Sequence, residues 1–380
     1  MALYKFLIVS DMHIGRPEDA LAGSTRLTTE TPDMPINDNP FESLKIFIKQ
    51  KKLQFNGILN LGDITNKGFI SGFNVGIKMM RELGFICQCP VIFTPGNHDY
   101  CYEFEDGAVK LLKRTINYPT DKDDANGNFW GKGYCLYKIE DVLFLICNSG
   151  KDVHRKEDRS NIPSFEDEFI EQIKSELERI NHRGPKIALT HHHIIQHSDI
   201  VSRYNANDTI DHADKFLSTL SDANFNCVLH GHKHISRFME ANNLAIMACG
   251  SLSALENLKI ADEQNYIHVL TLETDNDDVR GKIESYYYKL TKGWCDIVDH
   301  NFSINSRYTF GKAVNLEELA QKVVSHMPLD NPVLMVNNIL DKFPEMEFVS
   351  NKDYVHLKEV FIRLGYKFFH SPDAGIIIFK

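Results

Sequence analysis

Aspartate, asparagine and histidine side chains gather in five short motifs within the first two thirds of the chain. In order, these motifs are Asp11-Met12-His13, Gly62-Asp63, Gly96-Asn97-His98-Asp99, His191-His192-His193 and Gly231-His232-Lys233-His234. Carboxylate and amide oxygens combined with neutral imidazoles are ligands that suit divalent transition metals. Two such ions a few ångströms apart need a carboxylate to bridge them and further ligands on either side. The motifs together therefore predict a dinuclear metal site.

The motifs follow segments whose patterns predict β-strands. Residues 4–10, 57–61 and 91–94 are short apolar runs, and the amphipathic residues 41–52 and 73–83 between them are typical of helices. Strands that alternate with helices form parallel βαβ units, in which functional residues gather on the loops past the carboxyl ends of the strands. We therefore expect the motifs to meet at one edge of a sheet.

The later pattern predicts a second group of strands. The expected elements are a hairpin of residues 134–139 and 142–147, a helix over 165–180, strands over 186–190 and 226–230, and an antiparallel meander over 243–248, 266–273 and 281–290. Together with the first units, they predict a layered α/β sandwich with two sheets. Residues 14–39 and 197–211 lack regular patterning and are expected to be long loops, either functional lids or surface insertions.

In their order, the five motifs resemble the D-x-H, G-D, G-N-H-[DE], later H and G-H-x-H pattern of the calcineurin-like metallophosphoesterase superfamily. The resemblance covers about residues 1–290 and implies an α/β fold that is a four-layer α/β/β/α sandwich. It also implies the ligands of two metal ions. The first ion would be held by Asp11, His13, Asp63 and His234, with Asp63 bridging to a second ion that Asn97, His192 and His232 complete.

The sequence does not decide which histidine of the fourth motif is the metal ligand. Members of the superfamily usually read H-x-P after this strand, and Ile194 stands in the Pro position here. Counting back two residues favours His192. His191 remains the alternative, and His193 is the least favoured of the three.

The resemblance further implies hydrolysis of a phosphoester without a covalent enzyme intermediate. Two metal ions lower the pKa of a shared water from about 15.7 towards about 7, so that hydroxide attacks phosphorus. His98 would donate a proton to the leaving alkoxide, and Asp99 would either hold the His98 imidazole or cap the following turn. The mixed ligands suit manganese, iron, zinc, cobalt or nickel, and manganese is favoured.

The second motif narrows the class of substrate. Residues 62–68, Gly-Asp-Ile-Thr-Asn-Lys-Gly, lack the arginine of Ser/Thr protein phosphatases and the tyrosine of purple acid phosphatases. They resemble the G-D-[IL]-T-x-x-G of the class III cyclic-nucleotide phosphodiesterase group, so we expect a phosphodiesterase with a small, nucleotide-type substrate. The alternative is a DNA or RNA nuclease, because residues 10–15 resemble the S-D-x-H-[LI]-G of the double-strand-break repair exonuclease family. A non-catalytic scaffold is disfavoured, because every ligand position is filled.

A change of pattern after residue 290 predicts a second, smaller unit. We expect a catalytic domain over residues 1–300, a linker over 301–315 and a small α+β module over 316–380. The expected module has helices over 316–326 and 332–343, a strand over 347–349, a helix over 353–364 and a hairpin of 366–370 and 375–379, an order resembling a winged helix. Its seven Lys and Arg against nine Asp and Glu favour docking or homo-oligomerisation over nucleic-acid binding. In a nuclease, the module would instead clamp nucleic acid.

The composition disfavours several other classes of protein. Of 380 residues, 43% are hydrophobic and 25% are charged, which is the balance of a globular chain. The formal charge of −10 disfavours a large basic surface, and the best basic cluster, within residues 151–159, is interleaved with acids. Eight cysteines without CxxC spacing predict free thiols. Residues 3–9 are expected to be a first strand and not a signal peptide, and no apolar run is long enough to span a membrane, so we expect a cytoplasmic protein without a membrane partner.

Overall fold

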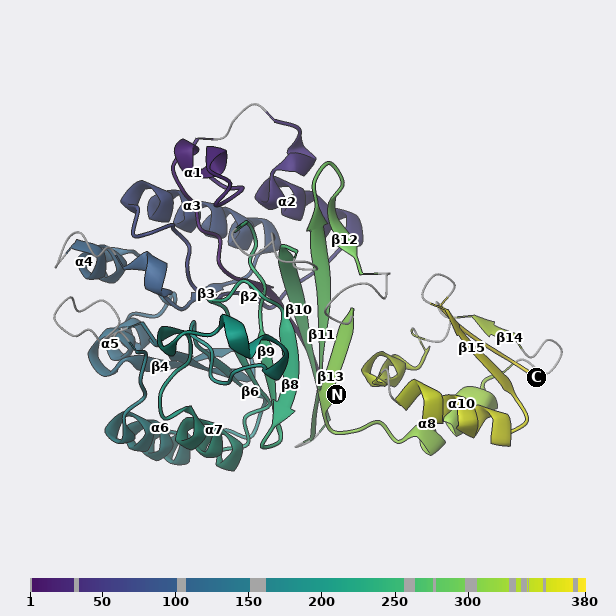
Figure 1. The fold of residues 1–380 in the computed structure, drawn as a ribbon. Helices are drawn as coiled ribbons and strands as arrows, with labels where there is room; N and C mark the ends of the chain where they lie inside the picture. Colours follow the sequence, from purple (N-terminus) through teal and green to yellow (C-terminus); the bar gives the residue numbers. More distant parts are fainter. Residues whose placement is uncertain are drawn as a thin grey trace.

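The computed structural model of the chain describes residues 2–30, 34–100, 107–150, 162–255, 264–275, 278–297, 306–327, 333–335, 340, 342–350, 353–371 and 375–380. Their strands form two large sheets in the main body and a three-stranded sheet in a C-terminal part beside it (Figure 1). Among these residues, no helix has both the length and the apolar character that a membrane span requires. The predicted basic cluster, residues 151–159, lies outside the described residues.

The first sheet combines parallel and antiparallel strands. Its parallel part is β1 (Ala2–Val9), β2 (Gly57–Asn60) and β3 (Val91–Phe93), and from β1 it continues antiparallel through β10 (Tyr266–Asp275), β11 (Asp278–Lys289) and β12 (Gly293–Asp296). The predicted βαβ units and most of the predicted meander are therefore parts of one sheet.

The second sheet begins with a hairpin that has the predicted bounds. The hairpin strands are β4 (Tyr134–Ile139) and β5 (Val142–Cys147), followed in the sheet by β6 (Lys186–Leu189), β7 (Cys227–His230), β9 (Leu244–Ala248) and β8 (Arg237–Ala241). The prediction that residues 243–248 belong to the meander was wrong, because β9 pairs in parallel with β7. Every residue of β9 is buried, as is typical of a strand inside a parallel sheet.

Helices cover the outer faces of both sheets and complete four layers (Figure 1). The first sheet packs on α2 (Pro40–Lys51) and α3 (Ile70–Cys87), and the second packs on α6 (Asp167–Ile180) and α7 (Ala213–Asp222). Between the sheets, the rings of Phe6 and Phe144 meet edge to face with centroids 5.1 Å apart. The predicted α/β/β/α sandwich is thus confirmed. The shorter helices α1 (Pro17–Leu21), α4 (Gly107–Arg114) and α5 (Asp123–Lys132) lie in the connections.

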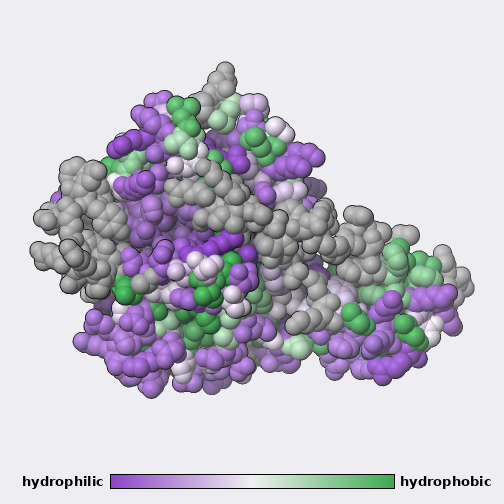
Figure 2. All heavy atoms as spheres, in the orientation of Figure 1, coloured by the Kyte–Doolittle hydropathy of each residue, from purple (hydrophilic) through white to green (hydrophobic). Residues whose placement is uncertain are grey.

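The C-terminal part has its own small core. Its elements are α8 (Leu316–Ser325), β14 (Val333–Met335), η5 (Pro344–Phe348), α10 (Asp353–Arg363), β15 (Lys367–Ser371) and β16 (Gly375–Phe379), with sheet order β14-β16-β15. Two predictions were wrong here, because residues 333–335 form a strand within the predicted helix and residues 344–348 form a 3₁₀ helix that overlaps the predicted strand. Figure 2 shows hydrophobic residues exposed on this part. The exposed large hydrophobic residues of the C-terminal part include Val355, Ile362 and Phe369.

Part of the predicted linker belongs to the first sheet. Residues 307–311 form β13 (Arg307–Gly311), which pairs antiparallel with residues 280–284 of β11. The C-terminal part is joined to this region through side chains, because Lys282 of β11 bonds Glu347 and Arg307 of β13 bonds the hydroxyl of Tyr354. The segment from 307 to 311 is therefore a structural strand and not a free tether.

Candidate metal centre

Loops at the carboxyl ends of five strands bring the predicted motifs together. Asp11 and His13 follow β1, Asp63 follows β2, Asn97 and His98 follow β3, the triple histidine follows β6, and His232 and His234 follow β7. The strands come from both sheets, so the site lies where the edges of the two sheets meet. The expectation that the motifs converge is met in the structure.

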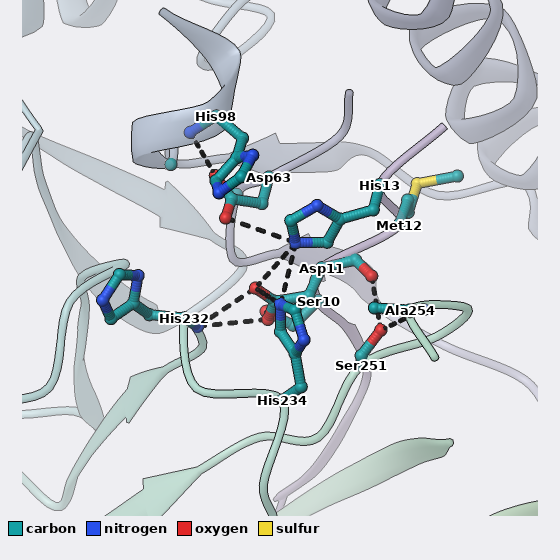
Figure 3. Close-up of polar contacts among 12 residues, drawn as sticks. Ser10, Asp11, Met12, His13, Asp63, His98, His232, His234, Ser251 and Ala254 are labelled. Atoms are coloured by element: carbon teal, nitrogen blue, oxygen red, sulfur yellow. Dashed lines mark hydrogen bonds and ion pairs between the residues drawn. The ribbon is translucent and has the colours of Figure 1, made fainter. Parts of the chain in front are cut away.

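The first cluster consists of Asp11, His13, Asp63 and His234, and one ligand atom from each lies within 4.8 Å of the others. Figure 3 shows His13 pointing toward both carboxylates. His13 Nε2 lies 3.4 Å from Asp63 Oδ2 and 3.7 Å from Asp11 Oδ1, while His234 Nε2 lies 3.5 Å from Asp11 Oδ1. The four residues are those implied for the first metal.

The second cluster consists of Asp63, His191 and His232, again with one ligand atom from each within 4.8 Å of the others. Asn97 completes it, because its Oδ1 lies 3.1 Å from His191 Nε2 and 3.0 Å from His232 Nδ1. His191 Nε2 lies 3.2 Å from Asp63 Oδ2. Asp63 is thus common to both clusters, as a bridging ligand must be.

The donor atoms fit two divalent cations. Within the described part of the chain, the buried Asp63 Oδ2 has no hydrogen-bond partner, although Oδ1 accepts one from the His98 backbone N–H at 2.7 Å. The Nε2 atoms of His13 and His234 face each other at 2.8 Å. Oxygen and imidazole donors that converge in this way are the mixed ligand set that manganese, iron, zinc, cobalt and nickel accept.

The electrostatics of the clusters agree with this fit. Burial by itself would raise the pKa of Asp63, but His191 and His98 hold it well below its usual range. Burial would lower the pKa of His13, but the neighbouring carboxylates of Asp11 and Asp63 raise it to about 10. The buried carboxylates therefore stay ionised only beside positive charge. Bound metal ions would supply that charge in place of protonated histidines.

The backbone of the ligand loops adopts an uncommon conformation. Five ligand residues have positive φ, namely Asp11 (52°), His13 (45°), Asp63 (51°), His232 (80°) and His234 (58°). Non-glycine residues rarely occupy this region, and clusters of such residues are typical of functional sites. The surrounding sheets therefore hold the ligands in a strained arrangement that local sequence preference would not select.

Two motif glycines allow the loops to approach closely. A Cβ atom on Gly96 would lie 2.1 Å from Asp63 Oδ1, and one on Gly231 would lie 2.5 Å from Asp11 Oδ2. Both distances are far below van der Waals contact. These glycines in the third and fifth motifs thus make room for the carboxylates.

The fourth motif presents His191, and not the favoured His192, to the cluster. The Nδ1 atom of His191 bonds the carbonyl oxygen of Leu61 at 2.7 Å, which leaves Nε2 facing Asp63. His192 instead bonds Ser149 Oγ through Nδ1 at 2.9 Å. The chain leaves β6 at Leu189, and after it the side chains of His191 and His192 reach different partners. The contacts therefore favour His191, the alternative left open by the sequence.

Replacement of these two histidines tests the assignment. We expect His191→Ala to lose about one equivalent of metal, because it removes an imidazole from the second cluster, and His192→Ala to keep both equivalents. Elemental analysis after loading with Mn(II) and desalting measures the difference. The opposite result, with metal lost only from His192→Ala, would restore the assignment that the sequence favoured.

Other side chains orient the ligands from behind. Asp208 accepts hydrogen bonds from His232 Nε2 at 2.9 Å and from Lys233 Nζ at 2.7 Å, and Ser10 Oγ bonds Asp11 Oδ2 at 2.5 Å. A carboxylate behind a ligating histidine fixes its tautomer and increases its basicity. Asp208 was not among the predicted site residues, and its only signal in the sequence was its place in the predicted long loop of residues 197–211.

His98 and Asp99 have separate environments. Lys67 N–H donates to His98 Nδ1 at 3.2 Å, so in the neutral ring the hydrogen lies on Nε2. Burial lowers the pKa of His98 to about 4. Asp99 accepts hydrogen bonds from Thr65 N at 3.1 Å and Gly96 N at 2.9 Å, which supports the alternative that it caps the turn.

Comparisons with known proteins found one matching family and several solved structures of low identity. The sequence profile of the calcineurin-like phosphoesterase family matches residues 4–236. No curated protein matches the sequence. Among solved structures, the GAP50 anchor of the Plasmodium inner membrane complex has 15% identity and a TM-score of 0.47, with 80% of this chain and 90% of that chain covered.

Two further solved structures have similar levels of identity. A candidate 5'-nucleotidase from Staphylococcus aureus has 14% identity and a TM-score of 0.43, and the match covers 72% of this chain and 51% of that chain. Vacuolar protein sorting 29 from Cryptosporidium parvum has 14% identity and a TM-score of 0.37, with 82% of this chain and 99% of that chain covered.

Proposed function

Because the chain belongs to the calcineurin-like phosphoesterase family, we propose that it is a dinuclear metal-dependent phosphodiesterase that acts on a small, nucleotide-type substrate. The observation that carries the proposal is the pair of clusters that share Asp63. A single shared carboxylate between two sets of imidazole and oxygen ligands is the arrangement of two-metal phosphoester hydrolysis.

The ligands divide the work between the two clusters. Asp11, His13 and His234 would hold one ion, Asn97, His191 and His232 the other, and Asp63 both. When bound, two such ions supply an activated water as nucleophile and neutralise charge on the phosphate oxygens. We favour manganese, because carboxylate and amide oxygens suit it together with imidazole.

His98 is proposed as the proton donor to the leaving group. In the neutral ring Nε2 carries the hydrogen, because Nδ1 accepts one from the Lys67 backbone N–H, and Nε2 is therefore the atom that would donate. Donation needs the protonated ring, so the negative charge of a bound phosphodiester would have to raise the pKa of His98 above the value of about 4 that burial gives it. The ring lies beside the first cluster, with its centroid 4.7 Å from that of His13. A donor at this position would stabilise the alkoxide that leaves as the phosphorus–oxygen bond breaks. Asp99 would act only through the turn that it caps.

Two features favour a small substrate over a nucleic-acid chain. The formal charge of −10 would repel a polyanion, whose binding depends on contacts between phosphates and Lys or Arg. The Gly62-to-Gly68 segment resembles that of cyclic-nucleotide phosphodiesterases, and it lies at the site through Asp63 and Lys67. A cytoplasmic location is proposed as well, because all described cysteines are free thiols, as in a reducing compartment.

The proposal is tested by hydrolysis, with Mn(II) added, of bis-p-nitrophenyl phosphate, a cyclic nucleotide and a short single-stranded DNA. We expect turnover of the first two and none of the DNA, with His191→Ala as the matched inactive variant. Turnover of none, by protein that elemental analysis shows to hold two metal ions, would contradict the phosphodiesterase assignment. Protein that takes up no metal at all would indicate a non-catalytic scaffold.

A nuclease remains the second candidate, because of the C-terminal part. Its order α8, β14, η5, α10, β15, β16 and its sheet order β14-β16-β15 are compatible with the winged-helix likeness suggested by the sequence. Cleavage of DNA alone in the same assay would make this part a nucleic-acid clamp. Otherwise, the exposed Val355, Ile362 and Phe369 favour a role in docking or homo-oligomerisation.

A further inference from the structure

Three histidines that the dinuclear centre does not use form a separate buried cluster. His193 follows β6, His197 immediately precedes the 3₁₀ helix η3 (Ser198–Arg203), and His230 is the last residue of β7. One ring nitrogen from each lies within 4.8 Å of the others. The ring centroids of His193 and His230 are 4.2 Å apart, and those of His193 and His197 are 5.9 Å apart.

The nitrogens of this cluster lack the partners that buried polar atoms normally have. Within the described residues, the Nε2 atoms of His193, His197 and His230 are all buried and have no hydrogen-bond partner. Most buried polar side-chain atoms are hydrogen-bonded, and exceptions commonly mark an ion or water that satisfies them. Three unpartnered imidazole nitrogens in one place therefore indicate a shared binding partner that accepts their lone pairs, such as a metal cation.

The chemical state of the rings suits a metal ion. All three rings are buried, with His193 and His230 fully so, and burial favours the neutral imidazole, which offers a lone pair. The Nδ1 atom of His193 bonds Tyr204 Oη at 2.7 Å. A bond to the second ring nitrogen is what fixes a metal-binding histidine in its tautomer and orientation.

The cluster differs in chemistry from the dinuclear centre. Its three members are imidazoles without a carboxylate, whereas each of the other clusters contains aspartate. Imidazole sets select zinc, copper or nickel over the more oxygen-seeking manganese and magnesium. Zinc in particular is bound by three histidines with a fourth position left for water. The two kinds of site would therefore prefer different ions.

We propose that His193, His197 and His230 form a third metal site, which takes one zinc-class ion. The bound ion would tie the end of β6 to the end of β7 and to the loop that carries Asp208. Each of these segments also supports the dinuclear centre, because His191, His232 and Asp208 lie on them. The third site is thus structural, and it holds neighbouring ligand loops in register.

The site is tested by counting zinc on the tag-free full chain after loading and desalting. We expect about three equivalents in the wild type and about two in His197→Ala. The matched control is His356→Ala, an exposed histidine of α10, which should keep three. Zinc should also raise the melting temperature of the His356→Ala control more than that of His197→Ala. Equal zinc content in wild type and His197→Ala would overturn the proposal.

A second variant tests the third site when the dinuclear centre is disabled. It also keeps the test valid if His197→Ala does not fold. Asp63→Asn removes the shared carboxylate but leaves the three histidines intact, so it should still bind about one equivalent of zinc. Cobalt(II) bound to this variant should give the visible absorption of a four-coordinate site. An Asp63→Asn protein that is folded yet binds neither zinc nor cobalt would refute the third site and leave the proposed phosphodiesterase untouched.

Discussion

Asp63→Asn is expected to empty both manganese sites and to lower kcat/KM for bis-p-nitrophenyl phosphate by more than about 100-fold. Loss of a residue that only supports a metal ligand costs up to about 100-fold, and loss of a ligand itself should cost more. The reason is that Asp63 Oδ2 lies 3.4 Å from His13 Nε2 and 3.2 Å from His191 Nε2, so that one carboxylate serves both clusters. A neutral amide leaves the second cluster without negative charge. Manganese equivalents by elemental analysis and steady-state kinetics measure the two effects together.

Asp222→Asn is the matched control for this experiment. Asp222 is an exposed residue at the end of α7, and the same change of charge there should alter neither manganese content nor rate. Circular dichroism shows whether both variants are folded. If Asp63→Asn kept two manganese ions and wild-type kinetics, Asp63 would not be a bridging ligand and the dinuclear assignment would fail.

His98→Ala is expected to slow hydrolysis according to the leaving group. For a diester with an alkyl alcohol as leaving group, we expect a fall in kcat of about 10²–10⁴-fold, which is the usual contribution of general acid catalysis. For bis-p-nitrophenyl phosphate, whose leaving group departs without a proton, the fall should be small. Metal content should not change, because in the structure His98 lies outside both ligand clusters. Parallel kinetics on the two substrates provide the measurement.

The control for His98→Ala is His356→Ala, which removes an exposed imidazole from α10 and should leave both rates unchanged. The ratio of the two rates separates proton donation from a general disturbance of the site. Equal slowing of both substrates by His98→Ala would assign His98 a positioning role, and unchanged hydrolysis of the alkyl diester would remove it from the mechanism.

Much of the fold could be predicted from the sequence because its strands are apolar and clearly bounded. The hairpin of β4 and β5 has the predicted bounds, and Glu140 and Asp141 between these strands are a polar turn. The helix α6 alternates buried and exposed positions with helical spacing, with Ile170, Ile173 and Leu177 buried. Such periodic patterns are visible in the local sequence, so the elements that they form can be predicted without knowledge of the fold.

The elements that were missed depend on their partners. Residues 333–335 lie in a segment that also suits a helix, but they pair with β16 as an edge strand of three residues. β13 has only a partly buried face and becomes a strand because β11 offers it a free edge. Short strands of this kind are stabilised by tertiary pairing, which the local pattern does not contain.

The site, like the fold, could be predicted where local sequence determines it and not where distant residues determine it. The sequence motifs predicted six residues that the structure brings together, because each stands at the end of a recognisable strand; they are Asp11, His13, Asp63, Asn97, His232 and His234. The choice between His191 and His192 depended on which way one side chain turns after β6. Asp208 could not be found, because its partner His232 is distant in sequence and comes close only through the fold.

The strand β13 also bears on where the chain can be divided. A piece that ended at residue 300 would leave residues 280–284 of β11 without β13, the strand that covers their backbone N–H and C=O groups. An uncovered strand edge is a template for pairing with another chain and promotes self-association. We therefore expect a stable piece of the main body to extend through Gly311, because the residues just before it cover this strand edge.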